Sequence, residues 1–168
     1  MRAEVVAALV ADICRGLARS GFRCTLIVSG HAEEENLAAL QAGAEQAAKT
    51  GALARVSGWY RDALPGLLHL LEEDHPEYDI HAGGWETSLV LLRAPELVDR
   101  ATLDTLPPNW GTRNIADRRA AGARTFPELG APEAYSGDPR RATPTTAENL
   151  YAALGRFVAD EGASLLRS

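Results

Sequence analysis

Cysteine, clustered basic charge and long apolar runs are all scarce in this chain of 168 residues. The two cysteines, Cys14 and Cys24, form no Cys-x-x-Cys pair, so neither a zinc knuckle nor a thioredoxin-type site is available. A net charge of -6 argues against a nucleic-acid-binding face, because such faces are rich in Lys and Arg. No stretch reaches the roughly 18 apolar residues of a membrane-spanning helix, and the N-terminus lacks the layout of a secretion signal. We therefore expect a cytoplasmic protein with no nucleic-acid partner and no membrane segment.

Three common catalytic or nucleotide-binding motifs are also missing. The chain has no Gly-x-Ser-x-Gly nucleophile elbow, no phosphate-binding P-loop and no Gly-x-Gly-x-x-Gly fingerprint. Serine hydrolases, nucleoside triphosphatases and dinucleotide-dependent enzymes therefore lose their main support. What remains is the composition of an ordinary globular protein, with 46% hydrophobic residues and enough chain to bury a core without disulfides.

Hydrophobic periodicity predicts alternating helices and strands in the first half of the chain. Apolar residues spaced as on one helical face predict a helix over 6–17, and a continuous apolar, β-branched run predicts a strand over 24–28. A second helix is expected over 34–49, a weaker second strand over 52–56, and a third helix over 64–71. This alternation is typical of an α/β fold with a parallel sheet.

The second half of the chain is harder to interpret. A helix is expected over 84–93, and a last helix is expected to be capped by Thr145 or Thr146. Between them lies a segment rich in Pro, Gly and Arg, over 102–146, with six of the nine prolines. Such a long loop is either functional, folded over a site or a neighbouring subunit, or partly disordered. We expect a single domain over 1–168 that includes this loop.

The first candidate site is the segment Ser-Gly-His-Ala-Glu-Glu-Glu-Asn at 29–36. It follows the predicted strand at 24–28, and ligands of open α/β sheets bind at the carboxyl ends of the strands. The imidazole of His31 and the carboxylate of Glu33 are both groups that ligate divalent metals. The glutamates equally suit a helix N-terminus, where carboxylates complement the helix dipole. A metal site and a plain helix start are both consistent with the segment.

The second candidate site is the segment Asp-Ile-His-Ala-Gly-Gly-Trp-Glu-Thr-Ser at 79–88. Its two glycines allow the backbone to approach a ligand closely. His81 suits general acid or base chemistry, because imidazole titrates near neutral pH, and Glu86 can hold or orient a polar substrate. A glycine turn that starts a helix beside a half-buried Trp85 explains the same residues. Trp59, after the second predicted strand, suits either a pocket wall or core packing.

These two segments, in this order, resemble the signatures of the creatininase (creatinine amidohydrolase) family. The block at 81–88 is similar to the family's His-Ala-Gly block that ends in Glu-Thr-Ser, and 29–36 is similar to its Gly-His segment after a strand. Arg-Ala-Pro-Glu-Leu-Val at 93–98 resembles the family's continuation, and 137–143 resembles its Gly-Asp-Pro element before the final helix. The helix and turn at 12–23 fit the helix before the histidine strand.

The resemblance implies a three-layer α/β fold with a mostly parallel sheet, in a homo-oligomer. It implies hydrolysis of a C–N bond in a small, in some members cyclic, amide. Divalent metal ions, zinc, manganese or iron, would activate a water molecule for that reaction. Two tryptophans, Trp59 and Trp85, are the candidates for walls of the substrate pocket.

The resemblance also assigns roles to four residues. His31 matches a metal ligand of the family, and Glu33 matches the second-metal ligand of the creatininases proper. His81 matches the catalytic histidine, which passes a proton to the departing nitrogen. Glu86 matches a glutamate that we assign to orientation of the substrate or the water.

One departure from the family pattern limits these expectations. Family members begin with a strand and loop of the type Glu-x-His-Gly…Asp, which supplies metal ligands, and no Glu-x-His-Gly is present here. We therefore expect a C-terminal portion of the fold, with the N-terminal strand or strands missing. His31 and Glu33 alone fall short of the three protein ligands typical of catalytic zinc.

The missing ligands would come from a complementary or identical partner chain or from a preceding segment. The alternative is a family member that keeps the fold and pocket as a binding or scaffold subunit, without metal-centred catalysis.

Overall fold

The computed structural model describes residues 1–168, and the chain divides into two compact units. The first, here called the sheet unit, comprises Met1–Leu64 together with Leu154–Ser168. The second, here called the helix unit, comprises Pro65–Ala153. None of the helices combines the length and the apolar character needed to cross a membrane.

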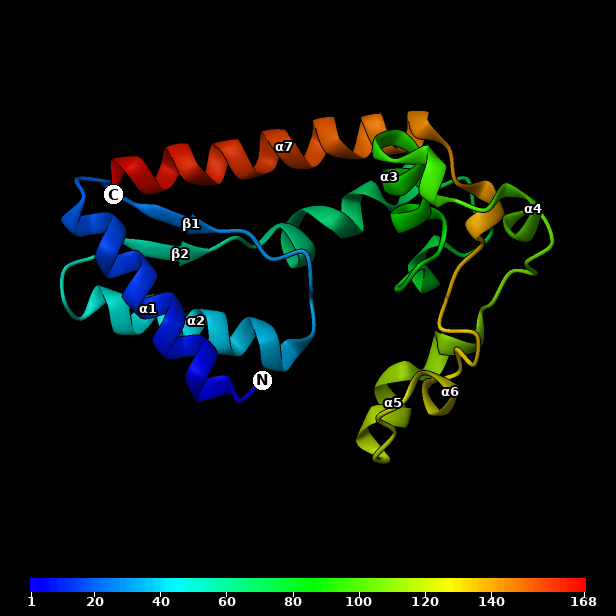
Figure 1. The fold of residues 1–168 in the computed structure, drawn as a ribbon, viewed down its shortest axis with the longest axis horizontal. Helices are drawn as coiled ribbons and strands as arrows, with labels where there is room; N and C mark the ends of the chain where they lie inside the picture. The colour runs from blue at the N-terminus through cyan, green and yellow to red at the C-terminus, as the bar shows by residue number, and fades with distance from the viewer. The chain divides into compact units, whose positions relative to one another are not determined.

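The sheet unit contains a small parallel sheet between helices (Figure 1). Its elements in chain order are α1 (Ala3–Arg19), β1 (Thr25–Ile27), α2 (Glu34–Ala48) and β2 (Ala54–Val56). The strands pair in parallel, with Thr25 opposite Ala54 and Ile27 opposite Val56. Helices α1 and α2 cover one face, and the C-terminal half of α7 (Pro144–Arg167) covers the other. The expected parallel α/β architecture is thus confirmed.

Small side chains let α1 and α2 pack closely against each other. A Cβ added at Gly43 of α2 would lie 2.7 Å from the carbonyl oxygen of Ala7 in α1, so only glycine fits at this contact. The core next to it is formed by Cys14, Ala47 and Ala52, with Ile27 of β1 packed against them. The alanine-rich composition of α2 therefore reflects this close helix contact as well as the helix propensity of alanine.

The helix expected over 64–71 is present, but as a 3-10 helix and not as an α-helix. After β2 the chain makes a π-helical turn, η1 (Trp59–Ala63), followed by a 3-10 helix, η2 (Leu64–Leu70). Pro65 has no N–H to donate to a carbonyl of the preceding turn, and Gly66 has a poor helix propensity. The apolar spacing therefore predicted a helical segment correctly, but not its 3-10 type.

The helix unit is built from short helices and turns. Its elements are η3 (Pro76–Tyr78), α3 (Gly84–Arg93), η4 (Pro95–Leu97), α4 (Arg100–Leu103), η5 (Gly111–Asn114), α5 (Ile115–Ala120), α6 (Phe126–Leu129), η6 (Pro139–Arg141) and the start of α7. Residues 102–146 thus contain several one- or two-turn helices. Two isolated antiparallel bridges join the parts of this unit, His81 with Ser136 and Asn109 with Gly137.

The start of α7 differs from the expected one. The helix begins at Pro144, and the hydroxyl of Thr143 accepts a hydrogen bond from the N–H of Thr146 at 3.0 Å. Thr143 therefore occupies the capping position, and the predicted caps at Thr145 and Thr146 are wrong. A proline in the first helical position explains the shift, because its missing N–H has no partner there in any case.

Candidate functional site

The turn after β1 is organised around the side chain of Ser29. Its hydroxyl donates to the carbonyl of His31 at 2.9 Å and accepts from the N–H of His31 at 3.2 Å. The amide of Asn36, in the first part of α2, donates to the Ser29 hydroxyl and to the His31 carbonyl. These bonds fix the backbone of His31, while 74% of its side chain is exposed to solvent.

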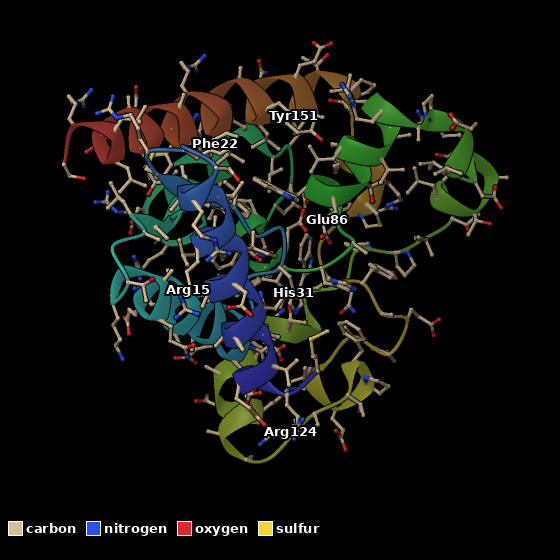
Figure 2. The ribbon with its side chains drawn as sticks, turned by 60° about the vertical axis from the view of Figure 1, so that its left-hand side comes forward. Arg15, Phe22, His31, Glu86, Arg124 and Tyr151 are labelled. Atoms are coloured by element: carbon tan, nitrogen blue, oxygen red, sulfur yellow. The ribbon has the colours of Figure 1, made fainter.

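His31 and Glu33 lie next to each other in this turn. The Nε2 atom of His31 is 3.5 Å from the Oε2 atom of Glu33, and both side chains are exposed. Glu33 sits directly before α2, whose first turn carries Glu34 and Glu35, so the helix-dipole interpretation also remains consistent with the structure. His31, labelled in Figure 2, follows β1 and precedes α2 in the chain.

The turn places two side chains of metal-ligating type, His31 and Glu33, side by side. The structure contains no group of three or more His, Cys, Asp or Glu side chains that could hold a metal ion. His31 offers a ring nitrogen and Glu33 a carboxylate, which are ligands that zinc and manganese accept. Further ligands are needed for a catalytic site of the usual kind.

Trp59 lies beside the His31 turn. Its indole Nε1–H donates to the carbonyl of Ser29 at 2.9 Å, which joins the ends of β1 and β2. The N–H of Trp59 donates to the hydroxyl of Ser57, and that hydroxyl donates to the carboxylate of Glu161 on α7. The structure therefore brings Trp59 into the same edge of the sheet as His31, although sequence reasoning did not identify Glu161.

The second candidate segment places His81 and Glu86 together in the helix unit. The Nδ1 atom of His81 lies 3.7 Å from the Oε2 atom of Glu86, and both side chains are about half exposed. The same Oε2 atom accepts a hydrogen bond from the N–H of Ala82, which fixes the carboxylate at the start of α3. The His81 ring stacks on Phe126, with the ring centroids 4.5 Å apart and the planes at 19°.

The backbone around His81 is constrained. The carbonyl of His81 accepts from the N–H of Ser136 at 2.7 Å, and Ala82 adopts a left-handed conformation with φ of 48°. A Cβ added at Gly83 would collide with the carbonyl oxygen of Ser136 and with the carboxyl of Asp79, so glycine is required there. The close backbone approach that the two glycines predicted is therefore an approach to the protein's own chain.

Two acidic residues that the sequence did not single out hold the start of α3. Glu73 accepts from the N–H of Gly84 at 3.1 Å, and Asp79 accepts from the N–H of Trp85 at 2.6 Å. Glu73 belongs to the acidic run Glu72-Glu73-Asp74, a composition that is typical of a solvated surface. The sequence could have indicated the role of Asp79. It is a short acidic residue ahead of a predicted helix start, where carboxylates accept backbone N–H groups.

Burial changes the acidity of both carboxyl groups. It raises the pKa of Asp79 to about 9, and the hydrogen bond to Glu73 and the negative charge of Glu73 act in the same direction. Burial also raises the pKa of Glu73, whereas its hydrogen bonds from Asp79 and from backbone N–H groups oppose that change. One proton is therefore retained by the pair at neutral pH.

An open hollow of about 400 Å³ lies on the helix unit next to Glu86. Its lining is mainly apolar, with polar groups from a few side chains. The residues that line it include Glu86, Val90, Leu103, Leu106 and Tyr135. Trp85 is not among the lining residues. The hollow is within the usual size range of small-molecule sites.

Comparison with known proteins identifies the family. The family model for creatininase, described as creatinine amidohydrolase, matches residues 1–161. A solved structure named "Creatininase Mn" has a TM-score of 0.65 and 22% identity, over 96% of this chain and 63% of that one. A crystal structure from Bacteroides fragilis NCTC 9343, which carries the name creatinine amidohydrolase, has a TM-score of 0.64 and 22% identity, over 95% and 59%. The chain thus spans less than two thirds of either structure's length. A comparison with curated proteins gives no match. The match over 1–161 establishes that this chain belongs to the creatininase family.

Proposed function

We propose that this chain is part of a metal-dependent amidohydrolase, in which it supplies the group that protonates the departing nitrogen of a small amide. The observation that carries the proposal is the His81–Glu86 pair, in which a half-exposed imidazole faces a fixed carboxylate. Family membership supports the same class of reaction.

His81 is the proton carrier of the proposed reaction. With Nδ1 turned to Glu86, the ring can exchange a proton with a substrate through Nε2. Glu86 faces Nδ1 of His81 at 3.7 Å, which leaves Nε2 to give a proton to the departing nitrogen as the C–N bond breaks. Stacking on Phe126 restricts rotation of the ring and thus keeps it oriented.

A divalent metal ion, when bound, would supply an activated water for attack on the amide carbon. His31 and Glu33 would hold it, since their donor atoms lie 3.5 Å apart on one exposed turn. The remaining ligands would come from a partner chain, identical or complementary, or from a further protein segment. Manganese, zinc and iron all accept such nitrogen and carboxylate ligands, and the name of one similar structure mentions Mn.

The open hollow beside Glu86 is the proposed place for the substrate. Apolar side chains line most of it, while the carboxylate of Glu86 offers a hydrogen-bond acceptor for an amide N–H. Its volume of about 400 Å³ suits a small molecule, linear or cyclic. Trp85 does not line this hollow. Trp59 would instead line the edge of the sheet near His31.

We expect the purified protein to hydrolyse at least one member of a panel of small linear and cyclic amides when Mn²⁺ or Zn²⁺ is present. Product amine or ring-opened acid is measured by mass spectrometry. A chelator should abolish the reaction and re-added metal should restore it, because activation of water depends on the ion. If the metal-loaded protein binds amides but hydrolyses none of them, the chain is a binding or scaffold subunit and the proposal is wrong.

A further inference from the structure

Glu73 and Asp79 form a carboxyl pair at the start of α3. Both are partly buried, and their side chains are hydrogen-bonded to each other. Glu73 accepts the N–H of Gly84 at 3.1 Å and the N–H of Asp138 at 2.9 Å, whereas Asp79 accepts the N–H of Trp85 at 2.6 Å. A hydrogen bond between two carboxyl groups requires a proton on one of them.

The charges around the pair are mostly negative. Glu86 on α3 and Asp138, just before η6, both act on it as negative charges. The two arginines of η6 pair with Asp138 instead, with Nε of Arg140 at 2.9 Å and Nε of Arg141 at 3.7 Å from its carboxylate. The proton between Glu73 and Asp79 is therefore what limits repulsion between these two carboxyls.

The proton belongs on Asp79. Glu73 uses its two oxygens as acceptors for two backbone N–H groups, which favours its ionised form. Asp79 accepts a backbone N–H bond from Trp85 and is the more deeply buried of the two. A protonated Asp79 can donate to Glu73 with one oxygen while the other accepts from Trp85.

We propose that Glu73 and protonated Asp79 are positioning residues, which clamp the start of α3 to the loop at 137–138 and thereby set the place of His81 and Glu86. The clamp works at close range. A Cβ added at Gly137 would lie 3.0 Å from Cγ of Asp79 and 3.1 Å from Oε2 of Glu73, so the loop rests directly on the pair. Ser136, next to Gly137, makes the backbone bridge to His81. This role does not depend on the identity of the substrate or on metal binding.

The clamp makes folding stability depend on pH. The pKa of Asp79 is about 9 in the folded protein, because burial and the neighbouring Glu73 disfavour its charged form, and an unfolded chain returns it to its ordinary value of 3.8. The folded state therefore holds one more proton than the unfolded state between these values. The stabilisation is complete below about pH 4 and is lost as the pH rises toward about 9.

Two isosteric substitutions separate the roles of the carboxyls. In Asp79→Asn, the introduced amide can donate to Glu73 and its oxygen can accept from Trp85, so the clamp keeps all its hydrogen bonds without a titrating proton. In Glu73→Gln, the introduced NH₂ group must face the N–H of Gly84 or of Asp138, and two donors then oppose each other. Glu72→Gln, at the exposed neighbouring position, is the matched control.

The test combines urea denaturation at pH 5, 7 and 9 with NMR of the His81 ring. We expect Asp79→Asn to keep the wild-type His81 signals and to lose the fall in stability between pH 5 and 9. Glu73→Gln should shift the His81 signals and lower the unfolding midpoint at all three pH values, while Glu72→Gln changes neither. The proposal is overturned if Asp79→Asn fails to fold, if it keeps the wild-type pH dependence, or if Glu73→Gln leaves both readouts unchanged. Because neither readout is activity, failure of the proposed hydrolysis would not affect this test.

Discussion

Replacement of His81 by alanine is expected to lower kcat for amide hydrolysis by about 10²–10⁴-fold, the usual range for loss of a general acid or base. The imidazole would no longer be present to protonate the departing nitrogen, and Glu86 would have no ring to orient. Bound metal should be unchanged, because His81 is not one of the proposed ligands, His31 and Glu33. Steady-state kinetics and metal analysis on the same preparation measure both effects.

His69 provides the control for this substitution. It is exposed on η2, and its Nδ1 atom lies 2.9 Å from the carbonyl oxygen of Gly66. It has no part in the proposed reaction. His69→Ala should therefore leave kcat and metal content as in the wild type. Equal loss of metal and activity in His81→Ala would place His81 among the metal ligands and would refute its assignment as a proton carrier.

Replacement of Leu150 by alanine is expected to lower the free energy of unfolding by about 2–5 kcal/mol. Leu150 lies in the part of α7 that belongs to the helix unit, and its side chain is fully buried. Truncation removes buried apolar area and leaves a cavity that the surrounding side chains fill only in part. Urea denaturation followed by circular dichroism measures the change.

The next residue along the same helix is the matched control. Tyr151, labelled on α7 in Figure 2, is 48% exposed, so Tyr151→Ala removes a side chain that is about half in solvent and leaves no enclosed cavity. Its effect should be under about 1 kcal/mol. Similar losses for both variants would show that Leu150 is not part of a tightly packed core.

Elements with strong local patterns were predictable from the sequence. The predicted helix over 84–93 coincides with α3, and the predicted strand over 24–28 contains β1 with one extra residue at each end. The predicted helices over 6–17 and 34–49 likewise correspond to α1 and α2. Periodicity and short β-branched runs are properties of neighbouring residues, so a single sequence contains them in full.

Elements governed by backbone chemistry were predicted less well. The apolar spacing over 64–71 predicted a helix but not its 3-10 geometry, which Pro65 and Gly66 favour because both weaken an α-helix. The choice of Thr143 rather than Thr145 as the cap of α7 depends on Pro144 in the first helical position. The helices within 102–146 have only one or two turns, so they are too short to show the hydrophobic period of a helix.

The site was predictable only where its residues are neighbours in sequence. His81 and Glu86 face each other across five residues at a helix start, which the motif itself indicates. Glu73 owes its role to Asp138, 65 residues away, and Glu161 owes its role to Ser57, 104 residues away. Such pairs form only when the chain has folded, so they cannot be recognised from a single sequence.

The metal content of the purified protein tests the proposed metal-dependent hydrolase most directly. The protein is loaded with excess Mn²⁺ or Zn²⁺, passed through gel filtration and analysed by mass spectrometry of the elements, beside the variant His31→Ala. We expect stoichiometric metal in the wild type and its loss in the variant, because His31 is a proposed ligand. Absence of metal from both proteins, together with hydrolysis that His31→Ala leaves unchanged, would contradict a metal site at this turn.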